Sequence, residues 1–351
     1  MVKPVIAGFV LLSLYACAWQ GETRPAASDH FDGQRFFNPG AQFDKGFFDL
    51  VRFAFTRQPG QWKRDLEIAP AHAPPPLMGD GELRVTFINH ATLLIQADGI
   101  NVLTDPIWSL RASPFSWAGP RRFVPPGIAF EDLPEIDVVL ISHDHYDHLD
   151  LPTLKRLHAE HDPLFVVGLR QGDLLRDHGI QNIQELDWWQ PLELENGCQL
   201  WGARSQHWTG RGLHGRNRSL WLSFVLETKG GPVYFAGDTG YADHFKQAHQ
   251  RFGAMRLALL PIGAYQPRWL TAFQHMSPDE AVQAHLDLNA ARSLGIHFGT
   301  FELADDGQFE PPQALARAVA RNGIAPDRFH APEFGGGYDV KPLEENAGCS
   351  Q

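Results

Sequence analysis

Cysteine is scarce in this sequence of 351 residues, and its scarcity excludes two ways of building a small domain or a metal site. The three cysteines are Cys17, Cys198 and Cys349, too few for a disulfide scaffold or a zinc site made of thiolates. Histidine, by contrast, occurs 17 times. Any metal would therefore have to be held by histidine and carboxylate side chains.

The sequence also lacks an excess of positive charge. It has 30 Lys and Arg against 41 Asp and Glu, a formal net charge of −11. General nucleic-acid binders usually carry a basic excess, so no nucleic-acid partner is expected. The hydrophobic content of 43% is ample for a packed core, and compact domains of about 200–250 residues are common.

No stretch is apolar over the ~20 residues that span a bilayer. The run 5–16, which follows Lys3, fits instead the ~7–15-residue apolar core of a signal peptide, so residues 1–17 are predicted to be one. Leu14-Tyr15-Ala16-Cys17 resembles a bacterial lipoprotein box, although Tyr15 is unusual there. The expected location is the bacterial cell envelope, with the protein membrane-associated through a lipid anchor on Cys17. A secreted or periplasmic soluble protein and an uncleaved anchor are the alternatives.

Residues 18–80 are predicted to form an arm packed on the main domain. Pro70 and the run Pro74-Pro75-Pro76 indicate a stiff, extended connector. A disordered linker is less favoured, because the phenylalanine content is too high. The side chains expected to contact the domain are Phe36, Phe37, Phe47, Phe48, Phe53 and Phe55.

Short strand patterns dominate the predicted main domain, residues 81–345. Residues 83–88 alternate with period two, and 138–141 form an apolar run typical of a buried strand. Helices are expected to begin near Asp150 and Ser277. Strands in runs with few helices between them indicate two β layers flanked by helices, not a doubly wound parallel sheet. The other predicted strands are 92–95, 100–103, 164–167, 200–203, 220–226, 233–235 and 257–260.

Metal-ligand side chains cluster directly after the predicted strand 138–141. The pattern His-x-His-x-Asp-His covers His143, His145, Asp147 and His148. Four such side chains in six residues cannot all face one way on a strand or helix, so a loop must gather them, and it can divide them between two ions. Imidazole and carboxylate suit Zn²⁺. A solvated turn is the alternative, but the pattern is too specific to favour it.

Three further candidates lie at predicted strand ends: His207, Asp238 and His297. A single histidine beside apolar residues is more often a core residue, so each is weak evidence alone. Their shared placement strengthens the prediction. Asp238 lies between Gly237 and Gly240, where glycine lets the backbone approach an ion, and a carboxylate can bridge two cations.

Together these motifs resemble the metallo-β-lactamase superfamily and, within it, the N-acylphosphatidylethanolamine-hydrolysing phospholipase D family. The resemblance runs from about Leu83 to Phe334. The pieces that carry it are Leu103-Thr104-Asp105-Pro106, Arg111-Ala112-Ser113-Pro114, the 143–150 loop, Glu185-Leu186-Asp187-Trp188-Trp189, Gln206-His207-Trp208, Phe235-Ala236-Gly237-Asp238-Thr239-Gly240-Tyr241, Pro261-Ile262-Gly263-Ala264-Tyr265, Pro267-Arg268-Trp269, Gln274-His275 and His297-Phe298-Gly299-Thr300-Phe301.

The resemblance implies an α/β (α+β) αββα four-layer sandwich that holds two Zn²⁺ per chain. It implies one ion on His143, His145 and His207, the other on Asp147, His148 and His297, and Asp238 between them. Asp147 and His275 are the implied catalytic residues, with His275 and Tyr146 in contact with substrate. For His275, a surface histidine before the Ser277 helix start is the alternative. Asp105 is expected to orient a ligand.

The implied reaction is phospholipase D-type hydrolysis of N-acylphosphatidylethanolamine to N-acylethanolamine and phosphatidic acid. β-Lactamases of the superfamily often have a thiolate at the position of Asp238. The absence of a cysteine at this position weighs against β-lactam hydrolysis. A lactonase or cyclic-phosphodiester hydrolase is the alternative, followed by a non-catalytic lipid-binding protein. The expected partners are a phospholipid and a membrane surface, drawn in part by the acid-free stretch 204–226 with its four arginines, though a solvated loop fits that stretch equally well. A homodimer is left open.

Overall fold

The computed structural model describes residues 27–41, 45–64, 66–68, 71–212 and 215–344. The predicted signal peptide, with Cys17, lies outside the described residues, and so does Pro70. In the described part of the chain, none of the helices combines the length and the apolar composition needed to cross a membrane.

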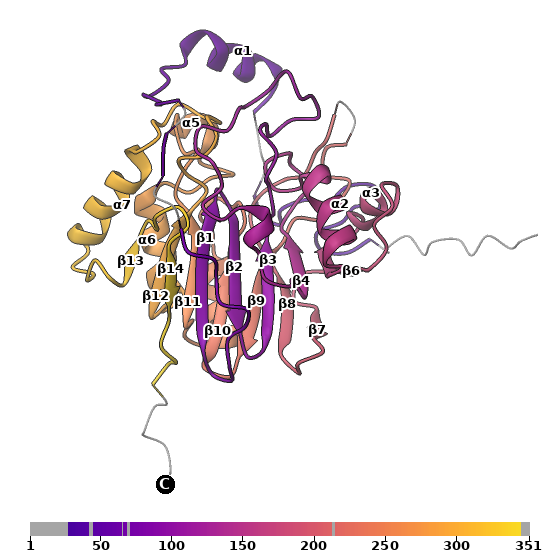
Figure 1. Cartoon of the computed structure of the whole chain (residues 1–351). Coiled ribbons are helices and arrows are strands. Elements are labelled where there is room, and N and C mark those ends of the chain that lie inside the picture. The colour runs from indigo at the N-terminus through magenta and orange to yellow at the C-terminus, as the bar shows by residue number, and fades with distance from the viewer. Residues whose placement is uncertain (1–26, 42–44, 65, 69–70, 213–214, 345–351) are drawn as a thin grey trace, which may run out of the picture.

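Two seven-stranded sheets form the centre of the molecule. In Figure 1 the violet strands of the first sheet overlie the salmon strands of the second. The first sheet has the order β14-β1-β2-β3-β4-β5-β6, with bounds β1 Leu83–Asn89, β2 Thr92–Ala97, β3 Ile100–Thr104, β4 Val138–Ile141, β5 Leu164–Gly168, β6 Ile183–Leu186 and β14 Gly337–Asp339. The second has the order β13-β12-β11-β10-β9-β8-β7, with bounds β7 Pro191–Glu193, β8 Gln199–Ala203, β9 Ser223–Thr228, β10 Gly231–Phe235, β11 Leu257–Pro261, β12 Arg292–Ile296 and β13 Phe329–His330.

Each sheet combines an antiparallel part with a parallel part. Strands β1, β2 and β3 pair antiparallel, whereas β3, β4, β5 and β6 are parallel. The second sheet repeats this arrangement, antiparallel from β7 to β10 and parallel from β10 to β13. The carboxyl ends of parallel strands share one edge, and loops at such edges commonly carry functional residues.

The central parallel strands β4 and β5 read as apolar runs because both of their faces are buried. Within β4, Val138 and Leu140 face the layer between the sheets, while Val139 and Ile141 face the helices. The same alternation places Val166 of β5 between the sheets. It follows from the period of two along a strand.

Helices cover both outer faces of the pair of sheets. On the first sheet, α2 (Leu151–Glu160) and α3 (Gly172–Arg176) bury Leu154, Leu157 and Leu175. On the second, α4 (His244–Phe252), α6 (Pro278–Asp287) and α7 (Glu310–Arg321) pack on the core. This layering confirms the predicted αββα sandwich. The predicted strand 220–226 begins later, at β9, because the amides of Leu220 and Leu222 bond to the carbonyls of Leu169 and Ser142 in neighbouring loops.

The phenylalanines of residues 27–80 differ in how far they are buried. Phe36 is 1% exposed, and its amide donates to the carbonyl of Asn217. Phe48 and Phe55 belong to α1 (Phe47–Thr56), and they are 84% and 88% exposed. At the upper end of the molecule in Figure 1, α1 lies beside α5 (Arg268–Thr271), where the Arg52 guanidinium covers the Trp269 ring at 4.4 Å.

Candidate metal centre

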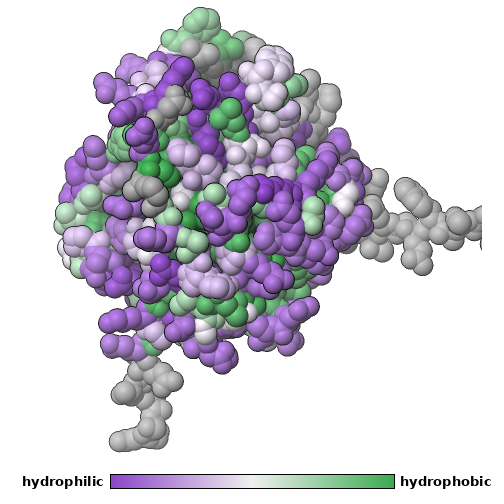
Figure 2. Space-filling model, viewed as in Figure 1, coloured by the Kyte–Doolittle hydropathy of each residue, from purple (hydrophilic) through white to green (hydrophobic). Residues whose placement is uncertain are grey.

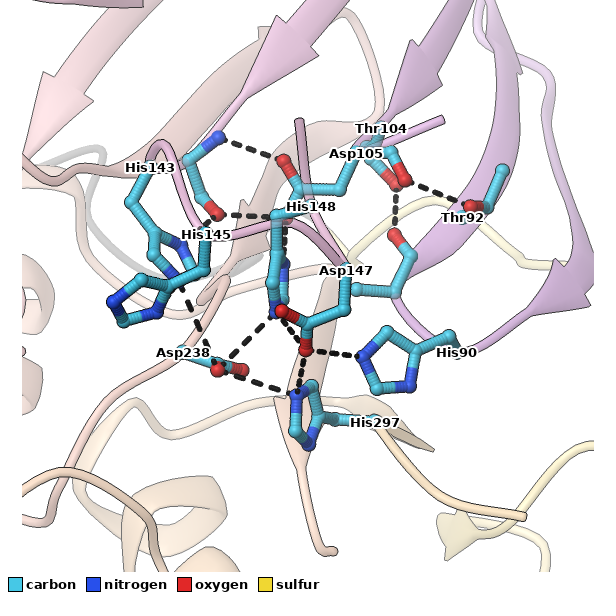
Figure 3. Close-up of polar contacts among 12 residues, drawn as sticks. His90, Thr92, Thr104, Asp105, His143, His145, Asp147, His148, Asp238 and His297 are labelled. Atoms are coloured by element: carbon cyan, nitrogen blue, oxygen red, sulfur yellow. Dashed lines mark hydrogen bonds and ion pairs between the residues drawn. The ribbon is translucent and has the colours of Figure 1, made fainter. Parts of the chain in front are cut away.

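The predicted ligands come together where strands of both sheets end. The 143–148 loop follows β4, Asp238 follows β10, and His297 directly follows β12. His207 lies four residues beyond β8. Figure 3 shows most of these side chains pointing toward one another. The strand ends of the two sheets thus meet at one place, which is what brings distant parts of the sequence together.

One group of ligand atoms surrounds Asp147, His148, Asp238 and His297. Oδ2 of Asp147 lies 3.3 Å from Nε2 of His148 and 3.4 Å from Nε2 of His297. Oδ2 of Asp238 lies 3.2 Å from each of the same two nitrogens. Four ligands at ~2.0–2.1 Å around a tetrahedral Zn²⁺ are separated by about 3.3 Å from one another. These four contacts therefore match the edges of a tetrahedral site.

The second group consists of His143, His145 and His207. Nδ1 of His145 lies 2.8 Å from Nε2 of His143 and 3.3 Å from Nε2 of His207. Asp238 also borders this group, since its Oδ2 is 4.0 Å from Nε2 of His143 and 3.9 Å from Nε2 of His207. Asp238 is the one carboxylate shared by both groups among the described residues, as the bridging role requires.

Buried polar atoms without partners indicate that these groups are built for cations. Among the described residues, Nε2 of His145 has no hydrogen-bond partner, and Nε2 of His148 and His297 and Oδ1 of Asp238 form no hydrogen bond beyond the ion-pair contacts given above. An unsatisfied buried polar atom costs about 1–3 kcal/mol, and several in one place would be hard to retain without a ligand. The donor set of nitrogen and carboxylate oxygen suits Zn²⁺. The residues present therefore fit two divalent ions.

A second layer of hydrogen bonds fixes the ligand rings. Nδ1 of His148 lies 2.7 Å from Oδ2 of Asp105, whose carboxylate also accepts from the amide and hydroxyl of Ser142. Nδ1 of His207 donates to the carbonyl of Gln274 at 3.0 Å. Such contacts choose the tautomer and the orientation of a metal-binding imidazole. The structure therefore supplies the orienting contact expected of Asp105.

Charge within the cluster sets the protonation of its members. Burial disfavours the imidazolium form of His148, but Asp238, Asp147 and Asp105 outweigh it and raise its pKa well above the usual range. Burial likewise opposes the charge on His297, and Asp238 with Asp147 raises its pKa to about 9. Burial would also raise the pKa of Asp238, but the nearby His148 and His297 lower it well below its usual value. Without metal, two protonated imidazoles thus neutralise the carboxylates, in the place of cations.

His90 belongs to this centre, and the sequence reasoning missed it. Its Nε2 lies 3.0 Å from Oδ2 of Asp147, and its ring centroid is 4.0 Å from that of His297. It occupies the turn between β1 and β2 with a φ of +48°, a conformation uncommon outside glycine. The same signal that singled out His297, a histidine directly after a predicted strand, could have found it.

The two predicted substrate contacts differ in their placement. The His275 side chain is 13% exposed, and its Nδ1 lies 3.8 Å from Oδ2 of Asp238. It therefore belongs to the cluster and is not a surface histidine. The Tyr146 ring instead lies under the Arg211 guanidinium at 3.9 Å. Arg211 also donates to the carbonyls of Asp144 and Leu149, so this arginine of the 204–226 stretch holds the histidine loop and is not simply solvated.

The fold and the site together define a metal-dependent hydrolase. Comparisons with known proteins agree. The model of the Beta-lactamase superfamily domain matches residues 100–298. The chain is 38% identical over 265 residues to the N-acyl-phosphatidylethanolamine-hydrolyzing phospholipase D 1 of Caenorhabditis elegans, covering 72% of this chain and 74% of that protein. It is 36% identical to the mitochondrial N-acyl-phosphatidylethanolamine-hydrolyzing phospholipase D of Saccharomyces cerevisiae, covering 68% of this chain and 52% of that protein.

A solved structure with the same fold is that of a metallo hydrolase from the archaeon Ignicoccus hospitalis. It superposes with a TM-score of 0.57 at 20% identity and covers 74% of this chain and 98% of that one. The chain therefore belongs to the metallo-β-lactamase superfamily and, within it, to the family of N-acylphosphatidylethanolamine-hydrolysing phospholipase D-like proteins.

Proposed function

We propose that this protein is a phospholipase D-type phosphodiesterase that cleaves N-acylphosphatidylethanolamine to N-acylethanolamine and phosphatidic acid. The observation that carries the proposal is the pair of ligand groups joined at Asp238, with His275 beside the shared carboxylate at 3.8 Å. Relatives that carry this activity in their names are 36–38% identical to the chain.

The proposed metal content is two zinc ions per chain. His143, His145 and His207 would hold one, Asp147, His148 and His297 the other, and Asp238 would contact both. Two such ions supply Lewis-acid activation of water and neutralise charge on a phosphoryl group. Asp147 is the proposed catalytic carboxylate, because its side chain is 14% exposed while its Oδ2 contacts both His148 and His297.

His275 is proposed to act on the phosphate and on the departing alkoxide. Burial lowers its pKa to about 4 in the metal-free protein, so it is neutral at pH 7. A phosphodiester anion next to the ring would favour the charged form and raise the pKa again. His275 would then hold a proton for the ethanolamide oxygen, which is a poor leaving group in water. Tyr146 is proposed as a second contact to the phosphate.

A membrane surface is the proposed place of action. Phe48 and Phe55 on α1 are exposed, and Figure 2 shows hydrophobic side chains at the upper end of the molecule, where Figure 1 places α1. Apolar side chains on an exposed helix bind the interface between headgroups and acyl chains. Together with a lipid anchor at Cys17, this would keep the site close to its phospholipid substrate.

The test is a panel of substrates offered to the metal-loaded protein: N-acylphosphatidylethanolamine, phosphatidylcholine, a lactone and a β-lactam. Mass spectrometry of the products should detect N-acylethanolamine and phosphatidic acid. Turnover of the lactone with neither phospholipid cleaved would contradict the proposal and favour the lactonase alternative. Metal-loaded protein that cleaves none of the four would favour the non-catalytic, lipid-binding alternative.

A further inference from the structure

A basic cavity of about 420 Å³ lies beside the hairpin that joins residues 110–112 to 120–122. The hairpin is held by the amide of Arg122, which donates to the carbonyl of Leu110, and by the amide of Ala112, which donates to that of Pro120. Five arginines and one acidic residue line the cavity: Arg57, Arg64, Arg111, Arg121, Arg122 and Glu302. In a chain with a net charge of −11, this is a local concentration of positive charge.

Arg122 is the unusual member, because it is buried and forms no ion pair with a carboxylate among the described residues, although the charge of Asp150 acts on it through space. It is 7% exposed, and its Nε and Nη2 donate to the carbonyls of Ser109 and Ile107. Its Nη1 has no hydrogen-bond partner. Burying a charged group is costly unless it is paired. Burial lowers the pKa of Arg122 to about 10, so the guanidinium remains charged at neutral pH.

Two of the carboxylates near the cavity pair with Arg57, and only that part of the charge is neutralised by them. Glu302 lies 3.1 Å from Nη2 of Arg57, and Asp305 lies 3.2 Å from Nε of the same arginine. Arg111 donates to the carbonyls of Ser116 and Gly119, contacts that leave its charge uncompensated. Arg64, Arg111 and Arg122 therefore offer positive charge to an anion, and Nη1 of Arg122 is a buried donor in the cavity wall without a hydrogen bond to the described residues. This is the chemistry that arginine uses for phosphates and carboxylates.

An apolar cavity of about 590 Å³ adjoins the basic one. The two share Arg121, Arg122 and Phe123 in their walls. The remaining walls of the apolar cavity include Leu66, Ile68, Trp108, Leu110 and Val124, together with one acidic residue, Glu67. Its volume lies within the ~300–1,000 Å³ typical of sites for small ligands. Positive charge thus lies next to a hydrophobic space large enough for a hydrocarbon chain.

This region is separate from the candidate metal centre. The Arg122 guanidinium lies 5.1 Å from the centroid of the Phe301 ring, and the ring of His90 lies 5.3 Å from the same ring. The contacts that connect Arg122 to the candidate ligand His297 thus run through two rings, Phe301 and His90. A ligand beside Arg122 would not contact the metal ligands.

We propose that the two cavities form a second binding site, for an amphiphilic anion with a phosphate monoester or carboxylate headgroup and a linear aliphatic chain. The headgroup accepts from Arg122 Nη1 and is neutralised by Arg64 and Arg111. The chain lies against Trp108 and Leu110. The assignment does not depend on the reaction proposed for the metal centre, and it would stand if that reaction proved to be another.

The test is isothermal titration of the full-length, metal-loaded protein with decyl phosphate, decanoate, inorganic phosphate and decanol. We expect decyl phosphate or decanoate to bind below about 1 mM, and inorganic phosphate and decanol to bind at least tenfold more weakly. Arg122→Gln should weaken the binding at least tenfold. Arg122 is buried, so its substitution could also disturb folding. Arg64→Gln and Leu110→Asp change exposed side chains and should leave the core intact. Each should weaken binding severalfold.

Two control variants distinguish this site from the metal centre and from a general effect of surface charge. Arg176→Gln removes an exposed arginine of α3 that pairs with Asp173 and Glu185, and it should leave binding unchanged. Asp238→Asn, in the metal centre, should leave it unchanged as well. Binding lost in Asp238→Asn but kept in Arg64→Gln and Leu110→Asp would place the ligand on the metals and overturn the proposal. Equal affinities for inorganic and decyl phosphate would overturn the amphiphilic assignment, and no binding by either amphiphile would overturn the site itself.

Discussion

Nδ1 of His148 lies 2.7 Å from Oδ2 of Asp105, and both side chains are fully buried. This contact turns Nε2 of His148 toward Asp147 and Asp238, at 3.3 and 3.2 Å. Asp105 is itself fixed by the amide and hydroxyl of Ser142, at 2.7 and 2.6 Å. The residue that follows β3 thus orients a predicted ligand in the loop that follows β4.

Asp105→Asn should weaken metal binding by about 10–100-fold, the usual effect of removing an orienting carboxylate. The amide lacks the charge that favours the correct His148 tautomer. Competition with a chelator measures the affinity. The matched control is Asp162→Asn, which alters an exposed pair in which Asp162 lies 2.8 Å from His158 and should leave the affinity unchanged. Equal affinities for Asp105→Asn and the unmodified protein would show that the contact does not orient the ligand.

Asp238 is expected to be indispensable, because its Oδ2 is common to both ligand groups. Elemental analysis of the purified protein should find about two transition-metal ions per chain, mostly zinc. Asp238→Ala should lower the metal content and abolish turnover. His158→Ala, outside the centre, should change neither. Purified protein without stoichiometric transition metal would remove the basis of the metal assignment.

Metal binding should release protons at pH 7. The pKa of His148 is raised well above the usual range and that of His297 to about 9 in the metal-free protein. Both imidazoles are therefore protonated at pH 7 and must lose a proton to bind an ion. We expect about two protons per chain to be released, and the affinity for metal to fall as the pH is lowered.

Titration of metal-free protein with zinc in two buffers of different ionisation enthalpy measures that release. His297→Gln should release one proton fewer than the unmodified protein, while His158→Ala should not differ from it. The contribution of His297 should fade as the pH is raised through about 9. A heat of binding that is the same in both buffers would contradict the protonation described for this centre.

The location of the protein stays a prediction from Cys17, which lies outside the described residues. If Cys17 is acylated, the mature protein should fractionate with membranes, and Cys17→Ser should release it. One acyl chain gives only marginal binding, so firm attachment requires several acyl groups. Cys198→Ser, at a buried cysteine, is the control and should not alter fractionation. Intact residues 1–16 on protein in the cytoplasm would contradict the prediction.

The strands and the ligands next to them were predictable because burial leaves a local pattern. Val138 to Ile141 is apolar at every position since both faces of β4 are covered, and His143 lies just beyond it. Asp238 and His297 were predictable for the same reason. Short edge strands such as β7, with two of its three residues exposed, carry no such pattern, and the sequence analysis did not find them.

Other features depend on contacts that the local sequence does not contain. Phe36 is buried and Phe48 exposed, although both lie in the same phenylalanine-rich segment; the backbone of Phe36 bonds to the distant loop at Asn217, a contact that the local sequence does not show. The local sequence placed His90 near the end of a predicted strand, but its contact with Asp147, 57 residues along the chain, is visible only in the structure. His275 lies in the turn after α5, and its contact with Asp238 likewise forms only when the two sheets pack together.

His275 distinguishes a phosphodiesterase from the alternatives. The proposed metal ions, once bound, would activate water, so His275 is not required to make the nucleophile. Its proposed work is at the phosphate and the departing alkoxide. His275→Ala should therefore retain both metals and lose about 10²–10⁴-fold in rate on an N-acylethanolamine phosphodiester, the usual range for one acid–base group. The loss should be smaller for a nitrophenyl phosphodiester, whose leaving group needs no proton.

The comparison of the two leaving groups, with metal content measured on the same samples, decides among three outcomes. A larger loss on the ethanolamide confirms proton donation to the alkoxide. Equal losses would leave His275 as a contact to the phosphate alone, and no loss on either substrate would remove it from the mechanism. His249→Ala is the matched control, because His249 lies on the exposed side of α4 and contacts the carbonyl of Gly253. This variant should leave both rates unchanged, because His249 is not in contact with the proposed site of reaction next to Asp238.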